Sequence, residues 1–94
     1  MKKNNDWFIY MIETKNGLIY TGITKDLERR FAQHQKAGAK FFRRSPPKRI
    51  LLSQGGFDHS SALKFEYRIK QLTRSLKLAL IRAGKITTYF TPTT

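Results

Sequence analysis

The sequence predicts an α/β domain of the α+β type, in which helices pack against a small, mainly antiparallel sheet of three strands. Three observations predict this class. Residues 7–12 form a strand-like apolar run, and the turn signal Asn16-Gly17 separates it from a second run over 18–22. The apolar spacing then changes to the period of a helix over 26–36. A third apolar run, over 50–53, is followed by two more helical patterns.

The first apolar run is hydrophobic on both of its faces. One face carries Trp7, Ile9 and Met11, and the other carries Phe8, Tyr10 and Ile12. Strands with this pattern are typical of the interior of a sheet that is covered on both sides. We therefore expect residues 7–12 to form the central strand.

The runs over 7–12 and 18–22 are expected to form a hairpin, and the length of its loop decides whether the two tyrosines share a face. A two-residue loop, Asn16-Gly17, places Tyr10 and Tyr20 on opposite faces. A three-residue loop, Lys15-Asn16-Gly17, pairs Tyr10 with Gly22 and brings both rings to one face. Three-residue loops with glycine in the left-handed position are a common alternative to the two-residue turn, so both arrangements stay open.

The first helix carries polar side chains on the side that bears its apolar residues. With Leu27 as the origin, Phe31 lies at about +40°, His34 at about −20° and Arg30 at about −60°. Arg29, at about 200°, faces water. An arginine on a packing face needs a partner or a function, unless its head group extends past the edge of the apolar stripe. Both interpretations of Arg30 stay open, and for His34 alone a structural or exposed role is favoured.

Length and composition limit the class of protein. The 94 residues suffice for one small domain, 1–94, with an ordered core over about 6–84 and a tail over 85–94. The chain has no cysteine, which excludes disulfides and thiolate metal sites. The longest apolar run near the N-terminus is too short to span a membrane. We therefore expect a cytoplasmic monomer that does not bind membranes.

The net charge indicates a polyanionic partner. The formal charge is +13, from 19 basic and 6 acidic side chains, and nucleic acid is the commonest polyanion in a cytoplasm. The basic side chains between residues 36 and 49 are Lys36, Lys40, Arg43, Arg44, Lys48 and Arg49. We expect them to contact phosphates. Phe41 and Phe42 interrupt these charges and either pack beneath the loop, which is favoured, or stack on bases.

The second half of the chain contains the signals that end a strand and begin a helix. Gln54-Gly55-Gly56 is expected to end the third strand. Asp58, Ser60 or Ser61 then offers an N-cap. The helix that follows carries apolar residues at three- and four-residue spacing, namely Ala62, Phe65, Ile69 and Leu72.

A last helix is expected over residues 76–82. Thr73 or Ser75 offers its N-cap, and Gly84 ends it. Residues 86–94 are polar and β-prone, which predicts a tail or a short edge strand.

Glu66 is the one acid among the seven basic side chains between Lys64 and Lys85. From the residues alone, an ion pair with Lys70, one helical turn later, is the favoured interpretation, and it contributes a few tenths of a kcal/mol. The alternative is a carboxylate that holds a divalent cation beside a bound phosphate.

The tyrosines, the arginine and the histidine together match a known pattern. Phe8-Ile9-Tyr10 and Tyr20-Thr21-Gly22 resemble the two triplets of the GIY-YIG nuclease domain, and Arg30 and His34 follow at matching positions. The resemblance covers nearly the whole chain and is greatest to small single-domain bacterial members. The chain is also similar to the nuclease domain of the eukaryotic Slx-type endonucleases.

The resemblance implies metal-dependent hydrolysis of a phosphodiester in DNA, with structure-specific cleavage in DNA repair or processing as its setting. The implied catalytic residues are Tyr10, Tyr20, Arg30, His34 and Glu66. Glu66 would hold Mg²⁺ or Mn²⁺, and Arg30 would bind the phosphate. Tyr10 would act as base or proton relay, assisted by Tyr20 and His34. A base role at pH 7 requires the Tyr10 pKa to fall by roughly three units, about 4 kcal/mol.

The sequence departs from the family pattern at three positions. Phe8 replaces the first glycine, Thr21 replaces an isoleucine, and Ile23 stands where several relatives carry a polar side chain. The asparagine that some members have beyond the glutamate has no evident counterpart. The chief alternative is therefore a nucleic-acid-binding module with a GIY-YIG-like fold and little or no catalysis. DNA, structured or single-stranded, is the expected partner, and an accessory that binds RNA is a third interpretation.

Overall fold

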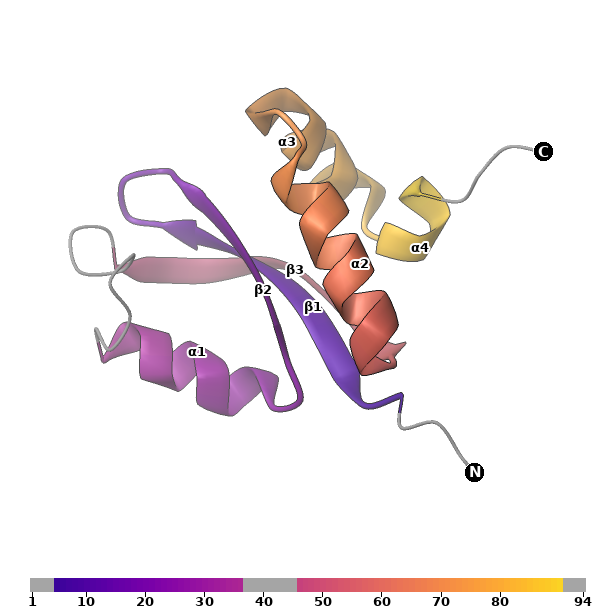
Figure 1. The fold of residues 1–94 in the computed structure, drawn as a ribbon. Helices are drawn as coiled ribbons and strands as arrows, with labels where there is room; N and C mark the ends of the chain where they lie inside the picture. Colours follow the sequence, from indigo (N-terminus) through magenta and orange to yellow (C-terminus); the bar gives the residue numbers. More distant parts are fainter. Residues whose placement is uncertain (1–4, 37–45, 91–94) are drawn as a thin grey trace.

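The structure, a computed structural model, describes residues 5–36 and 46–90. Its strands and helices follow the order β1 (Trp7–Thr14), β2 (Ile19–Thr24), α1 (Leu27–Gln35), β3 (Pro47–Phe57), α2 (His59–Lys70), α3 (Arg74–Ala83) and α4 (Ile86–Tyr89). The predicted α+β class is confirmed, because both strand pairs are antiparallel and the helices pack on the sheet (Figure 1).

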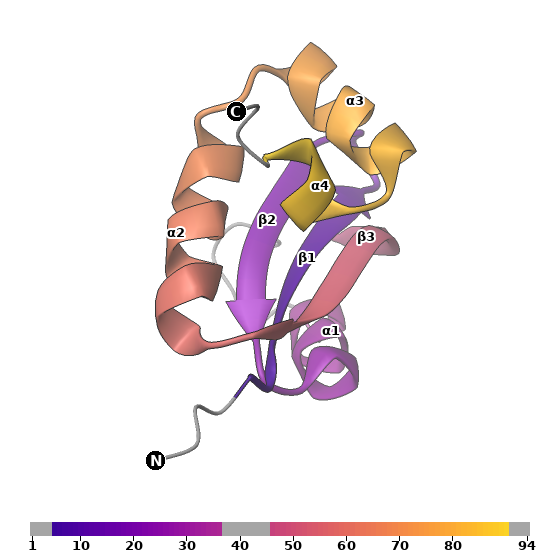
Figure 2. The same ribbon diagram turned by 90° about the vertical axis from the view of Figure 1, so that its right-hand side faces the viewer.

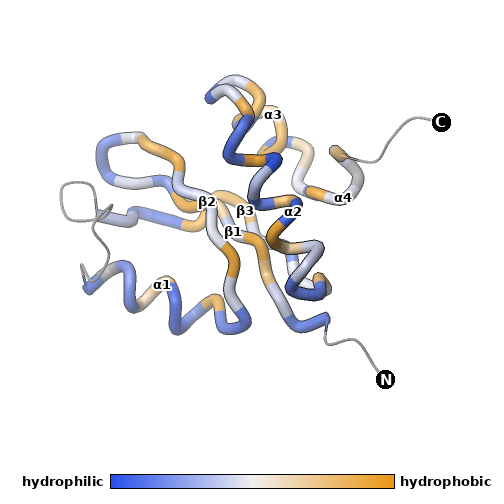
Figure 3. Tube along the Cα trace, in the orientation of Figure 1, coloured by the Kyte–Doolittle hydropathy of each residue, from blue (hydrophilic) through white to orange (hydrophobic). Residues whose placement is uncertain are grey.

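The sheet has three strands in the order β2-β1-β3, so β1 is the central strand, as its two apolar faces predict. Figure 2 shows the three strands side by side. On one face, Ile9 and Met11 pack against residues of α2, α3 and α4. On the other face, Tyr10 and Ile12 pack against residues of α1. Apolar residues lie along the strands and recur in α2, α3 and α4, whereas α1 is mostly hydrophilic (Figure 3).

The hairpin has the three-residue loop. The backbone N–H of Thr14 donates to the carbonyl of Leu18 at 2.9 Å, and Gly17 has a φ of 80°. This loop sets the register in which Ile12 faces Tyr20 and Tyr10 faces Gly22. Both tyrosines therefore lie on the α1 face of the sheet.

The helices of the second half begin where the sequence offers N-caps. The side chain of Asp58 accepts from the N–H of Ser61 at 2.8 Å at the start of α2, and Thr73 caps α3 in the same way. Gly84 ends α3 in the left-handed conformation, with a φ of 78°. The core beneath these helices includes Ala62, Ile69, Leu80 and Ile86.

The predicted end of the third strand is wrong. β3 continues through Gln54-Gly55-Gly56 and ends at Phe57. A Cβ atom on Gly55 would lie 2.6 Å from the ring of Phe8, so this glycine leaves room for the ring. Gly56 has a φ of 90°, and the register between β1 and β3 shifts around Phe8. The glycines therefore form an irregularity within the strand instead of ending it.

Residues 86–89 also differ from the predicted tail or edge strand, because they form the short helix α4. Ile86 is fully buried in the main core. The side chain of Gln54 accepts from the backbone N–H of Ile86 at 2.6 Å and donates to the hydroxyl of Thr87 at 3.1 Å. Tertiary contacts thus override the local β preference of this segment.

Thr21 provides a test of the packing beneath α2. Its hydroxyl is buried and has no hydrogen-bond partner among the described residues. Because a buried hydroxyl without a partner destabilises the fold, we expect Thr21→Val to raise the free energy of unfolding by about 1 kcal/mol. Urea unfolding measures this change.

Thr14→Val is the matched control, because the buried hydroxyl of Thr14 accepts from the backbone N–H of Leu18 at 3.0 Å. This variant is expected to lower the free energy of unfolding by about 1 kcal/mol. Equal effects of the two substitutions would contradict the assignment of Thr21 as the destabilising group.

Candidate active site

Three rings form a cluster on the α1 face of the sheet. They come from three elements: Tyr10 from β1, Tyr20 from β2 and His34 from α1. The ring centroids of Tyr10 and Tyr20 are 6.2 Å apart, and those of Tyr20 and His34 are 5.4 Å apart. The three-residue loop of the hairpin makes this cluster possible, because it sets both tyrosines on the face that α1 covers.

Gly22 allows the Tyr10 side chain to lie across β2. The two residues face each other in the antiparallel register. A Cβ atom on residue 22 would lie 2.5 Å from the Tyr10 hydroxyl oxygen, a distance at which one of the two must move. The glycine is therefore needed for space, and the Tyr10 hydroxyl reaches α1 because residue 22 has no side chain.

Tyr10 and His34 form a buried polar pair. The Tyr10 hydroxyl lies 3.0 Å from Nε2 of His34, and the residues are 1% and 5% exposed. Burial and then the positive charge of Arg30 lower the pKa of His34 below its usual value, which favours the neutral imidazole at pH 7. When the ring proton is on Nδ1, Nε2 accepts a hydrogen bond from the Tyr10 hydroxyl.

The surroundings of Tyr10 keep its phenol protonated. Burial raises the pKa of Tyr10 most, the neighbouring Tyr20 and the carboxylate of Glu66 raise it further, and only Arg30 lowers it. The fall in the Tyr10 pKa that a base role requires is therefore not produced by the protein's own groups. The geometry favours the relay alternative, with His34 as the acceptor.

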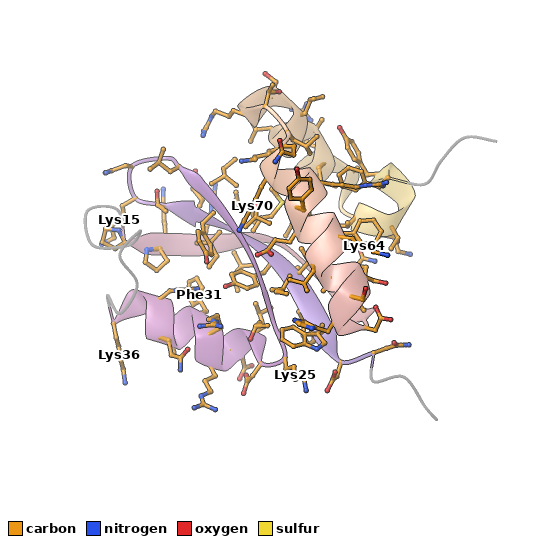
Figure 4. The ribbon with its side chains drawn as sticks, in the orientation of Figure 1. Lys15, Lys25, Phe31, Lys36, Lys64 and Lys70 are labelled. Carbon is orange, nitrogen blue, oxygen red and sulfur yellow. The ribbon has the colours of Figure 1, made fainter. Side chains whose placement is uncertain are left out.

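Arg30 and Glu66 approach the same tyrosine from different helices. Both charges act on the Tyr10 hydroxyl, Arg30 from α1 and Glu66 from α2, which lies across β1 and β2. The side chain of Glu66 is 19% exposed, and its Oε2 lies 3.4 Å from Nζ of Lys70. Lys70 extends from α2 toward β2, whereas Lys64 leaves the helix on the other side (Figure 4). The predicted ion pair is thus present, and the charge of the carboxylate also acts on Tyr10.

Arg30 is exposed, in agreement with the alternative in which its head group extends past the apolar stripe. It lines a cavity of about 340 Å³ at the start of α1, together with Lys25 and Arg29. The sequence did not single out this cavity. The feature of the sequence that could have indicated it is the group of three cations at the start of the helix, Lys25, Arg29 and Arg30. Lys25 directly precedes the N-cap, Asp26.

The expected basic loop is only partly described. Lys36, Lys48 and Arg49 are exposed. The predicted end of the loop is wrong, because Lys48 and Arg49 belong to β3, where Arg49 faces Glu13 of β1. The guanidinium of Arg49 donates from Nε to Oε1 of Glu13 at 2.7 Å, so this cation already has an acidic partner. The other members of the loop, Lys40, Phe41, Phe42, Arg43 and Arg44, lie outside the described residues.

The donor atoms around Glu66 suit one kind of metal site. Within residues 5–36 and 46–90, no group of three or more His, Cys, Asp or Glu side chains is arranged to hold a metal ion. Glu66 offers a single carboxylate, and Mg²⁺ is commonly held by one or two carboxylates together with water and substrate phosphate. The residues therefore fit a cation that is shared with a phosphate, and they do not fit a closed structural metal site.

A family model, the GIY-YIG catalytic domain, matches residues 6–79. The chain belongs to this family. GIY-YIG nuclease domains generally use divalent metals, in agreement with the donor set around Glu66. In the described part of the chain, no helix has the length and apolar character needed to cross a membrane.

Similar proteins are small bacterial GIY-YIG members. The UPF0213 protein YhbQ of Escherichia coli strain K12 is 46% identical over 79 residues, which cover 83% of this chain and 79% of that protein. A UPF0213 protein of Photorhabdus laumondii is 42% identical over 78 residues, which cover 82% and 75%. The solution NMR structure of a UPF0213 protein of Bacillus halodurans matches with a TM-score of 0.55 and 33% identity, over 93% of this chain and 98% of that one.

The pKa of His34 leads to a prediction on stability. Folding lowers this pKa, so the unfolded chain binds the proton more readily, and stability is highest above the unfolded pKa of about 6.5 and falls as the pH drops. We expect the urea midpoint to decrease between about pH 7.5 and pH 5.5, and the decrease to be smaller in His34→Gln. His59→Gln is the control, because His59 is exposed and stacks on Trp7. An unchanged pH dependence in His34→Gln would contradict the prediction.

Proposed function

We propose that this GIY-YIG protein is a metal-dependent endonuclease that hydrolyses phosphodiesters in DNA. The observation that carries the proposal is the convergence on one hydroxyl. The Tyr10 oxygen lies within hydrogen-bonding distance of His34, interacts with Tyr20, and is influenced by the charges of Arg30 and Glu66. A cation, an anion and a proton acceptor around one phenol are the groups that phosphodiester hydrolysis requires.

Arg30 is the phosphate-binding group in this proposal. Its guanidinium can donate two parallel hydrogen bonds to phosphate oxygens, and its exposure leaves it accessible to substrate. The positive charge stabilises the additional negative charge that the phosphate develops as the water attacks. Because Arg30 also influences the Tyr10 hydroxyl, the phosphate it binds would lie beside the proton relay.

Tyr10 and His34 form the relay. As the oxygen of the attacking water bonds to phosphorus, its proton moves to the Tyr10 oxygen, and the Tyr10 proton moves to Nε2 of His34. The bond from phosphorus to the leaving oxygen breaks, and solvent protonates that oxygen. The phenol never needs to exist as a free phenolate, which agrees with the raised pKa of Tyr10. Tyr20, whose ring packs against both residues, positions the relay.

Glu66 is the residue that would hold the divalent cation, Mg²⁺ or Mn²⁺. When bound, this ion supplies positive charge to the phosphate oxygens and lowers the pKa of a nearby water. Lys70 would then give up its contact with the Glu66 carboxylate. An ion pair between residues four apart on a helix is worth only about 0.3–0.5 kcal/mol, so a cation can replace Lys70 at little cost.

A nucleic-acid-binding module without catalysis is the second candidate function. Phe8 in the place of the first glycine and the ion pair of Glu66 with Lys70 favour it. Incubation with labelled flaps, junctions, duplexes and single strands, with Mg²⁺, with Mn²⁺ and with EDTA, separates the two. The nuclease proposal expects cleavage of at least one DNA with metal and none with EDTA. If no DNA or RNA is cut, the binding module is the better assignment.

A net charge of +13 supports binding to DNA, with RNA as the alternative substrate. We place the protein in the cytoplasm as a monomer and assign it to DNA repair or processing.

A further inference from the structure

A second basic site adjoins the candidate active site at the beginning of α1. It is a cavity of about 340 Å³ with mainly polar walls. The residues that line it are Thr24, Lys25, Asp26, Arg29, Arg30 and Gln33. Three of these side chains are cationic and one is a carboxylate, so the cavity attracts anions.

Local hydrogen bonds hold the carboxylate in a structural role. Asp26 is the N-cap of α1, and its Oδ1 accepts from the backbone N–H of Arg29 at 3.1 Å. The hydroxyl of Thr24 accepts from the backbone N–H of Asp26 at 3.1 Å. Because the protein's own groups bind these backbone amides, the cationic side chains are what an anion would meet.

The cations of the cavity are accessible. Arg29 and Arg30 are exposed. Nζ of Lys25 lies 3.9 Å from the Asp6 carboxylate, and both side chains are more than half exposed, so this long ion pair contributes little and can be exchanged. The same ammonium lies 5.7 Å from the centroid of the Trp7 ring, which keeps the lysine close to the start of α1.

Arg30 connects this cavity to the active site. It lines the cavity, and its charge also acts on Tyr10 and His34. Arg29 and Arg30 are consecutive on the helix and therefore point about 100° apart. Lys25 and the cavity lie at the opposite end of α1 from Lys36 (Figure 4).

We propose that Lys25, Arg29 and Gln33 bind a backbone phosphate of DNA that neighbours the phosphate held by Arg30. The assignment rests on the proposed function for the role of Arg30. Guanidinium, ammonium and amide N–H groups are the donors that proteins use for DNA phosphates, and none of the residues that line the cavity is an aromatic on which a base could stack. A phosphate bound here holds the strand at a second point beside Arg30, which sets the scissile bond against the relay.

The first test is the salt dependence of DNA binding in EDTA, measured by anisotropy with a fluorescein-labelled single strand. Lys25→Gln and Arg29→Gln are each expected to weaken binding and to flatten the slope of log affinity against log salt by up to about 0.7. Arg82→Gln is the control, because Arg82 is exposed on α3, on the other side of the sheet from α1 (Figure 1). Equal slopes for all three variants and the wild type, or no binding by the wild type, would overturn the proposal.

The second test locates the contact along the strand. A series of DNA strands carries one uncharged methylphosphonate each, at successive positions. At one position, the methylphosphonate is expected to weaken DNA binding by the wild type. At that position it should have no further effect on binding by Arg29→Gln, because this variant has already lost the same contact. Additive losses at every position would show that Arg29 acts only through general charge and would overturn a defined phosphate site.

These binding tests need no cleavage, so they separate the two proposals. If the slope falls as expected and no DNA is cut, the phosphate site stands and the nuclease assignment fails. If DNA is cut and the slopes are unchanged, the nuclease assignment stands and the phosphate site fails. A slope that falls with RNA strands alone would overturn the assignment to DNA.

Discussion

Glu66→Gln is expected to abolish DNA cleavage, by at least about 100-fold in rate, and to leave DNA binding nearly unchanged. The substitution keeps the size and the hydrogen-bonding capacity of the side chain and removes the charge that would hold the cation. Binding persists because cations on other parts of the chain contact the phosphates. Cleavage of a labelled DNA in Mg²⁺ and anisotropy in EDTA measure the two effects separately.

Glu13→Gln is the matched control for this variant. Glu13 resembles Glu66 in burial, with side chains that are 23% and 19% exposed, and each pairs with a basic side chain. Glu13 lies at the end of β1 and pairs with Arg49 of β3, so its loss is expected to leave cleavage intact. If the purified wild type cuts and Glu66→Gln cuts equally well, another site or a contaminating nuclease is responsible, and the role of Glu66 is refuted.

The sequence predicts the central strand, but it does not determine whether Tyr10 and Tyr20 lie on the same face of the sheet. The pattern over residues 7–12 predicts a strand that is covered on both sides, because both of its faces are apolar. The face of Tyr20 relative to Tyr10 depends on one residue of loop length, which local preferences do not decide. The register of the structure selects the three-residue loop, and the candidate site depends on this choice.

The differences between prediction and structure have tertiary causes. From the sequence alone, Gly55 is expected to end the strand, but in the sheet it provides the space that the ring of Phe8 fills. Ile86 begins a β-prone segment, and its burial beside Gln54 fixes a helical turn instead. In both cases the decisive contact joins residues more than 30 positions apart, which no local pattern reveals.

The position of Phe8 bears on the departure from the GIY-YIG pattern. The family's first triplet begins with glycine, and here a phenylalanine takes that place while Gly55 on the neighbouring strand has no side chain. The ring of Phe8 fills the space beside Gly55, and Tyr10 lies two residues later on β1. The substitution is therefore compatible with an intact relay of Tyr10 and His34.

Gly22→Ala is the second variant with a large expected effect. The new Cβ would lie 2.5 Å from the Tyr10 hydroxyl oxygen and 2.6 Å from the ring carbon that bears it. Since β2 is held in register by β1, the Tyr10 ring is the part that can move, and the movement breaks the hydrogen bond to His34. We expect cleavage to fall by at least about 100-fold, because the relay loses its geometry, and stability to fall by about 1–3 kcal/mol from overpacking.

Gly55→Ala separates the loss of stability from the loss of the relay. Its Cβ would meet the ring of Phe8 at 2.6 Å, so the steric conflict is of similar size, at a residue outside the site. Both variants are expected to unfold at lower urea concentration, and only Gly22→Ala is expected to lose cleavage at temperatures where both are folded. NMR signals of the His34 ring should shift in Gly22→Ala and stay in place in Gly55→Ala. Equal cleavage by the two folded variants would show that the space at residue 22 serves packing alone, and that Tyr10 does not act through His34.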